Sequence, residues 1–348
     1  MHTGTLEWRP MTRDPLALDD WLSALLEARA VPGAALALVR GGAIEVIAAG
    51  TRDQDSGEPV TADTVFDAAS LSKPMVAYAV LQLADAGLLD LDQPLSQLVP
   101  ALVSADDGSI TFRHVLTHTC GLQNLRSGKE PLKMYFAPGT RYSYSSLGFM
   151  YMQKAIEART GEPMELTLRR LVFVPLGMRN SSFEWQEAFA ANLAIPHQGG
   201  ERLAKHKPPA ASASYSLQTT AGDYGRFIAA VLQGAWLRQA TWREWFRPVV
   251  HVPRGAAVDL DETPAPTEDD VAWGLGWGVE ASGGSFFQWG KMDGVRAFAL
   301  GNVAEQAGLA LFTNGNTGLR LMDDVAGLVL PGEHPAIPWL AACVTEID

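Results

Sequence analysis

The sequence predicts an α+β fold, that is, an α/β protein with one antiparallel β-sheet flanked by helices and built from both termini. Two β-rich runs flank Gly41-Gly42 near the amino end. Apolar residues at helical spacing dominate from residue 70 to about 234, and strand-like runs return after residue 273. Strands at both ends with helices between them indicate a sheet that the chain leaves and later rejoins, so a mainly helical lobe is inserted into it.

The elements are expected in the following order. A first helix covers residues 16–30, and a β-hairpin turns at Gly41-Gly42. The helical region is interrupted by loops at residues 100–108 and 120–139, and a helix at residues 319–330 closes the body. The late strands are predicted in the runs WGLGWGVEA, SFFQWGKM, VRAFALGN and GLALFTNGN.

This order predicts two domains with the active site at their interface. Residues 1–66 and 270–348 form a discontinuous sheet domain, and residues 67–269 form a mainly helical domain. The stretch 247–270 is rich in proline and acidic residues, which predicts an exposed excursion: a solvated loop, with a lid or rim of the site as the alternative.

Composition limits the function classes. The chain has 348 residues, 47% of them hydrophobic, and a formal net charge of −12, which argues against nucleic acid or an anionic membrane as partner. Its two cysteines, Cys120 and Cys343, are expected to be buried free thiols. No signal peptide and no apolar run of membrane-spanning length is visible, so a cytoplasmic protein without a membrane partner is predicted.

A serine and a lysine stand three residues apart at the start of a predicted helix, in DAASLSKPMVAYAVLQLADAG. Pro74 lacks an N–H and fits only the first turn, so the helix begins near Leu71 with Ser70 at its amino end. Residues three apart share a helix face, so the Lys73 amine can reach and activate the Ser70 hydroxyl. A lone pattern of this kind favours a simpler interpretation, a capping serine and a solvated lysine.

Two later segments supply further candidate groups. Tyr144 lies in YSYSSLGF, where a loop passes into a helix near Ser146, and a phenol near an ammonium can relay protons; taken alone, it is a packing tyrosine. The run QWGK is predicted at a strand edge, where Gly290 allows close approach to the backbone. Two backbone N–H groups at such places can form an oxyanion hole.

Together these segments resemble the serine β-lactamase and penicillin-binding-protein superfamily, which includes class C β-lactamases, D,D-peptidases and related serine esterases. The resemblance covers nearly the whole chain and implies a β-lactamase/transpeptidase-like fold, acyl transfer through an acyl-enzyme, and no cofactor or metal. Besides the three motifs, it rests on VPGAALALV, TVFDAASLSK, GLLDLDQPLSQLVP, VLTHTCGL, SLQTTAGDYGRF, GLGWGV and LFTNGN in this order.

The resemblance assigns roles residue by residue. Ser70 matches the acylated nucleophile, Lys73 its activating amine and Tyr144 the proton relay, with Tyr142 as a competing register. The oxyanion hole is expected from the backbone N–H groups of Ser70 and Lys291. Whether Lys73 or Tyr144 takes the serine proton stays open.

The chain departs from the family pattern at two positions. Ser146 stands where many members have Asn, which shortens a donor to a substrate carbonyl. Gln288 stands where Lys or His usually begins the triplet, so a cation for a substrate carboxylate is lost unless Lys291 restores it. Trp289, inside the motif, is expected to line the acyl pocket.

Three functions follow from the resemblance. The first is a carboxylesterase acting on small neutral esters, favoured by Gln288 and Trp289. The second is a β-lactamase or D,D-peptidase, and the third is a non-catalytic acyl-binding relative. The substrate expected is a small-molecule ester or amide. His114 and His118 invite a Ser-His-Asp or metal interpretation, but buried or capping histidines are expected.

Overall fold

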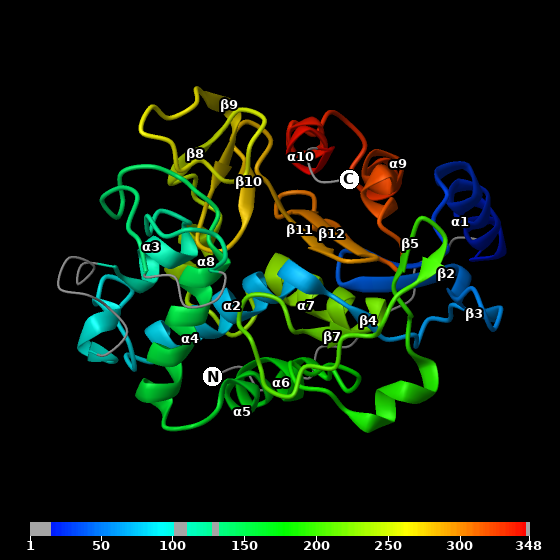
Figure 1. Ribbon diagram of the computed structural model, residues 1–348, viewed down its shortest axis with the longest axis horizontal. Coiled ribbons are helices and arrows are strands. Elements are labelled where there is room, and N and C mark those ends of the chain that lie inside the picture. Colours follow the sequence, from blue (N-terminus) through cyan, green and yellow to red (C-terminus); the bar gives the residue numbers. More distant parts are fainter. Residues whose placement is uncertain (1–14, 101–109, 127–131, 346–348) are drawn as a thin grey trace.

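The computed structural model describes residues 15–100, 110–126 and 132–345. A nine-stranded antiparallel sheet runs through its centre in the order β3-β2-β1-β13-β12-β11-β10-β9-β8 (Figure 1). The sheet therefore takes strands from both termini, as predicted. Its strands are β1 (Gly33–Arg40), β2 (Ala43–Asp53), β3 (Glu58–Pro59), β8 (Val250–Pro253), β9 (Thr267–Trp273), β10 (Gly278–Glu280), β11 (Ser285–Met292), β12 (Val295–Asn302) and β13 (Ala307–Thr313).

Both faces of the sheet are covered, and strand β1 shows how. Alternate residues of a strand point to opposite faces. Ala35, Ala37 and Val39 enter the core shared with α2 (Ser72–Asp85) and α7 (Ala221–Gln233). Ala34, Leu36 and Leu38 enter a second core, shared with α1 (Pro15–Arg29), α9 (Met322–Val329) and α10 (Ala336–Thr345). Continuous apolar runs such as GAALALV are what a strand buried on both faces requires.

The remaining helices lie mostly on the α2 side of the sheet (Figure 1). They are α3 (Phe112–Leu116), α4 (Ser146–Thr160), α5 (Met164–Leu168), α6 (Val174–Leu176) and α8 (Gln239–Trp245). Two small ribbons pair β4 (Phe66–Asp67) with β7 (Gln218–Thr219) and β5 (His197–Gln198) with β6 (Glu201–Arg202). No helix in the described part of the chain is both long and apolar enough to cross a bilayer.

Several predicted elements need correction. The stretch 247–270 is not a plain solvated loop, because it contains β8 and the start of β9, which pair with each other and extend the sheet. The helix at residues 319–330 is not the last one, since α10 follows it. Within WGLGWGVEA only Gly278–Glu280 is strand after Trp273. Most of the predicted loop at 100–108 lies outside the described residues, and the division into two domains stays a prediction.

Candidate active site

Ser70 sits on a tight turn between strand β4 and helix α2. The chain leaves Asp67, passes through a 3₁₀ turn at Ala69–Leu71 and enters α2 at Ser72. Ala69 has φ +47°, in the left-handed region that a side chain rarely adopts. From Thr64 to Leu81 every residue except Ser70 is buried. The fold thus leaves one serine partly exposed in an otherwise buried stretch.

Buried hydrogen bonds hold this turn. The Ser72 hydroxyl donates to the Ala69 carbonyl at 2.6 Å and accepts from the Leu217 N–H at 3.0 Å. The Ala68 N–H donates to the Leu217 carbonyl at 2.8 Å. Strain at a functional residue persists only where its surroundings fix it. These bonds from the segment before β7 provide that constraint.

Lys73 lies one helical turn after Ser70 and is fully buried. Its Nζ is 3.0 Å from Ser70 Oγ and donates to the Ser214 carbonyl at 2.7 Å. Burial lowers the pKa of this amine well below its ordinary value. In its neutral form this amine has a lone pair, with which Lys73 can accept the Ser70 proton while it still donates to Ser214.

Tyr144 brings a phenol to the same place. The Lys73 Nζ lies 4.8 Å from the centre of its ring, and its hydroxyl accepts a 3.1 Å hydrogen bond from the Gln288 amide. Burial raises the pKa of Tyr144, although hydrogen bonds to Ser70 and Gln288 act in the opposite direction. The phenol therefore stays protonated at neutral pH. The competing Tyr142 packs its ring 5.4 Å from that of Trp273.

Gln288 is fully buried, and its amide nitrogen is used inside the protein. It donates to the Tyr144 hydroxyl and to the Ser70 carbonyl, both at 3.1 Å. The sequence suggested only that this residue lacks a charge for a substrate carboxylate. In the structure it ties the tyrosine to the serine turn.

Strand β11 passes close against the serine turn because Gly290 has no side chain. A Cβ at this position would lie 2.5 Å from the Ala68 carbonyl oxygen. Strand β10 pairs with β11 only at Phe286 and Phe287. After these two residues, that edge of β11 faces the serine turn, which Gly290 contacts, and not another strand. Strand β11 therefore passes the serine turn at Gly290, and the partly buried Lys291 is the next residue along the strand.

Trp289 and Ser146 complete the predicted set. Trp289 is 7% exposed, with its ring 4.9 Å from that of Tyr144 and 5.7 Å from that of Trp339 on α10. Ser146 is the first residue of α4, and its N–H donates to the Asn124 side-chain oxygen at 3.0 Å. The predicted site residues thus come from β11, the serine turn, the first turn of α2 and the segment that leads into α4.

Sequence reasoning missed two neighbours of this site. Ser214 contacts Lys73 through its backbone carbonyl, and a backbone contact leaves no residue-type signal. Asn124 caps the Ser146 N–H from a loop, where a single polar residue is unremarkable. Both are brought in by tertiary structure.

The histidine and cysteine predictions are confirmed. His118 is fully buried and accepts the Ser145 N–H on Nδ1 at 3.0 Å, with its ring stacked 4.1 Å from that of Tyr144. His114 caps α3 reciprocally with Thr111. Cys120 and Cys343 are buried free thiols.

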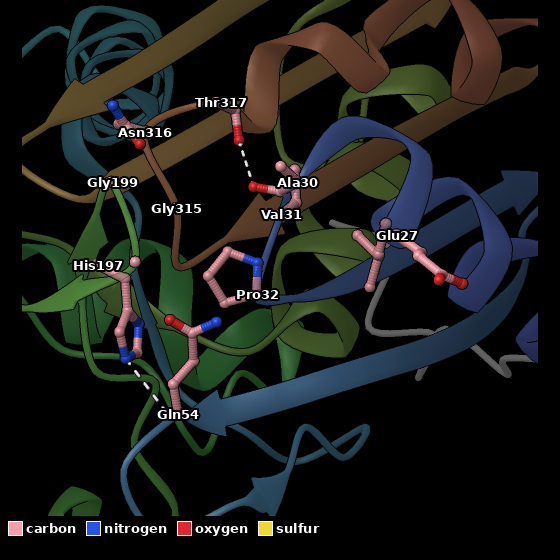
Figure 2. Close-up of a pocket in the computed structure, with 12 residues that line it drawn as sticks. Glu27, Ala30, Val31, Pro32, Gln54, His197, Gly199, Gly315, Asn316 and Thr317 are labelled. Atoms are coloured by element: carbon pink, nitrogen blue, oxygen red, sulfur yellow. Dashed lines mark hydrogen bonds between the residues drawn. The ribbon is translucent and has the colours of Figure 1, made fainter.

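A separate cavity of about 400 Å³ lies at the end of α1 (Figure 2). Its lining includes His197, Gln54 and Gly315, and the Gln54 N–H donates to the His197 ring at 3.2 Å. None of its lining residues is among the groups that contact Ser70, Lys73 or Tyr144. It is distinct from the candidate active site.

Comparison with known proteins agrees with this geometry. The sequence model of the Beta-lactamase family matches residues 18–331. The chain therefore belongs to this family. In this chain, the buried Lys73 amine lies beside Ser70.

Named relatives within the family differ in activity. The chain is 32% identical to penicillin-binding protein 4 of Amycolatopsis lactamdurans over 57% of its length, and 32% identical to esterase EstB of Burkholderia gladioli over 51%. These matches cover 56% and 53% of the two relatives, so the chain spans little more than half their length. It is also 24% identical to the D-alanyl-D-alanine-carboxypeptidase/endopeptidase AmpH of Escherichia coli, over 77% of this chain and 79% of that protein.

Solved structures share the fold. The octameric penicillin-binding protein homologue from Pyrococcus abyssi superposes with a TM-score of 0.75 at 18% identity, covering 91% of this chain and 77% of that one. A class C β-lactamase mutant gives a TM-score of 0.73 at 18% identity, covering 88% and 95%. The predicted β-lactamase-like fold is confirmed.

Proposed function

We propose that this chain is a serine hydrolase that cleaves small neutral esters through an acyl-enzyme on Ser70. The observation that carries the proposal is the 3.0 Å contact between Ser70 Oγ and the buried Lys73 amine. A serine hydroxyl beside a buried amine whose pKa is lowered is an arrangement that can activate a serine nucleophile.

The steps of ester cleavage follow from the environments of the Lys73 amine and the Tyr144 phenol. Lys73 takes the Ser70 proton as Oγ bonds to the ester carbonyl carbon. The backbone N–H groups of Ser70 and Lys291 stabilise the oxyanion. When the carbon–alkoxide bond breaks, Tyr144 gives its proton to the leaving alcohol and regains one from Lys73. Water then repeats the sequence on the acyl-enzyme, releasing the acid and restoring Ser70.

The preference for neutral esters rests on Gln288. Its amide is buried and already bonded to Tyr144 and to the Ser70 carbonyl, and it carries no charge. A charge-assisted hydrogen bond to a carboxylate contributes about 1.5–3 kcal/mol, and a neutral one about 0.5–1.5 kcal/mol. Carboxylate-bearing β-lactams and D-alanyl peptides should therefore bind about five- to thirtyfold more weakly than with a cation at this position. The named esterase relative supports the same choice.

The second candidate is a β-lactamase or D,D-peptidase. It is favoured by the penicillin-binding protein 4 relative, which is as similar to this chain as the esterase is. Lys291, next to Gly290 on β11, is the residue that can supply the missing positive charge.

A panel of p-nitrophenyl esters, nitrocefin and a D-Ala-D-Ala peptide tests the choice, with Ser70→Ala as control. We expect the highest kcat/KM for short-chain esters and slow nitrocefin turnover that Lys291→Ala leaves nearly unchanged. Gln288→Lys keeps a donor toward Tyr144 and adds a charge, so it should raise the nitrocefin-to-ester ratio about five- to thirtyfold. Efficient nitrocefin turnover that collapses in Lys291→Ala would instead establish the β-lactamase function.

A further inference from the structure

The loop over residues 254–266, here called the clamp loop, touches the candidate active site through Tyr144. Its base is closed where the Arg254 N–H donates to the Pro266 carbonyl at 2.8 Å. The Tyr144 N–H donates to the Ala257 carbonyl at 2.9 Å. The Asp259 N–H donates to Ser143 Oγ at 3.2 Å. The clamp loop therefore bonds to Tyr144 and to the residue before it, Ser143.

The tyrosine segment is held on a second side by His118. The Ser143 N–H donates to the His118 carbonyl at 2.9 Å, and the Ser145 N–H donates to the His118 ring at 3.0 Å. Residues 143 and 145 thus bond to His118, while Tyr144 between them bonds to the clamp loop. Without the clamp loop, the backbone that carries the phenol is fixed on one side only.

One buried carboxylate organises the clamp loop. Asp259 is 8% exposed, and its two oxygens accept the N–H groups of Asp261 at 3.3 Å and Ala265 at 2.9 Å. It also pairs with Arg141 at 3.5 Å. The Arg141 guanidinium donates to the Asp261 carbonyl at 2.6 Å and lies 4.5 Å above the Phe136 ring. Asp259 therefore fixes both the turn of the loop and its attachment to the tyrosine segment.

We propose that Asp259 is a positioning residue for Tyr144, acting through the clamp loop. The inference rests on the proposed function, because it assumes that Tyr144 moves a proton in ester cleavage. The phenol must reach both Gln288 and Ser70, and a misplacement of about 1 Å in a reacting group costs about a hundredfold in rate. A loosened clamp loop would leave substrate binding intact and would misplace the proton donor.

A double-mutant cycle between Asp259→Ala and Tyr144→Phe tests the proposal. With Tyr144 present, Asp259→Ala should lower kcat about ten- to a hundredfold with little change in KM. In the Tyr144→Phe background the same change should cost less than about threefold, because the group it positions is gone. Glu262→Ala is the matched control, since this exposed carboxylate of the same loop has no hydrogen bond or ion pair among the described residues. It should keep the parent kcat.

Equal losses of kcat in the two backgrounds would overturn the proposal, because a merely structural residue lowers the amount of folded enzyme irrespective of Tyr144. No loss of kcat in either background would also overturn it. If Asp259→Ala does not fold, Ser143→Ala decides: it removes only the acceptor for the Asp259 N–H and should lower kcat about three- to tenfold. An unchanged kcat in Ser143→Ala would then contradict the proposal.

The rate at which a fluorophosphonate labels Ser70, followed by intact mass, separates this proposal from the proposed function. If no ester is hydrolysed but labelling slows in Asp259→Ala and not in Glu262→Ala, the function fails and the positioning role stands. If esters are hydrolysed and the cycle is additive, the function stands and the positioning role fails.

Discussion

The serine turn and the tyrosine segment meet in one site but are specified in different ways. Ser70 and Lys73 are three residues apart on one helix, so their contact is local and visible as a motif. Tyr144 is aligned by partners far along the chain: Ser145 bonds to His118 across 27 residues, and Ser143 bonds to Asp259 across 116. The Ser70–Lys73 pair is therefore set by the geometry of one helix, whereas the position of Tyr144 depends on how distant segments pack.

The largest effect should come from removing the nucleophile. Ser70→Ala should lower kcat/KM by more than about a thousandfold, because it removes the hydroxyl that forms the proposed acyl-enzyme. Intact-mass spectrometry after fluorophosphonate treatment should show one adduct in the wild type and none in the variant. Ser56→Ala, an exposed serine in the turn after β2, is the control and should keep the adduct. An adduct in Ser70→Ala would place the nucleophile elsewhere.

The next test joins the two regions. Lys73→Ala and Tyr144→Phe should each lower kcat about a hundred- to ten-thousandfold, the range of proton-transfer catalysis. The double variant should be hardly slower than the worse single one, because the two groups act as one unit. Steady-state kinetics on a short-chain alkyl ester, whose alkoxide must be protonated as it leaves, measure this. Fully additive losses would show that the local and long-range halves work independently.

A buried acid that belongs to neither region should alter stability without altering chemistry. Burial raises the pKa of Glu165 from near 4.5 to about 7, although the Phe183 N–H and the Ser182 hydroxyl donate to it. The folded state then binds more protons than the unfolded state between these values. The contribution of Glu165 to stability is therefore full below about pH 4.5, falls as pH rises to about 7, and is constant above, a loss of about 3 kcal/mol.

Denaturant unfolding at pH 5 and pH 8 measures this change for Glu165. Glu165→Gln should remove most of the difference while kcat/KM stays at the wild-type value. A pH dependence that survives the substitution would assign it to other groups.

The smallest effect concerns the strain before the nucleophile. Ala69→Gly should stabilise the fold by about 1 kcal/mol, because glycine adopts the left-handed conformation without steric cost. Equilibrium unfolding in urea measures the change. A destabilised variant would mean that the Ala69 methyl contributes more by packing than its backbone costs.

Much of the architecture could be predicted from local pattern. The hairpin at Gly41-Gly42 and strands β11 and β12 lie where alternating or continuous apolar runs place them. The segment 247–270 was misjudged because its prolines and acidic residues indicate solvent exposure. Its strands form by pairing with each other and with β10, and its Asp259 is buried and forms an ion pair with Arg141. The amino-acid composition of the segment does not reveal this strand pairing or this ion pair.

By itself, the sequence determined the order of the elements, the Ser70–Lys73 pair and the neutral Gln288 at the head of its triplet, because each depends on residue type or on spacing within one helix or strand. Only the tertiary structure decided which groups complete the site: the Ser214 carbonyl on Lys73, the Gln288 amide on Tyr144, and the clamp loop on the tyrosine backbone. The physical reason is that these partners act through backbone atoms or through burial. Both are set by packing between segments distant in the chain, and neither leaves a mark in the local sequence.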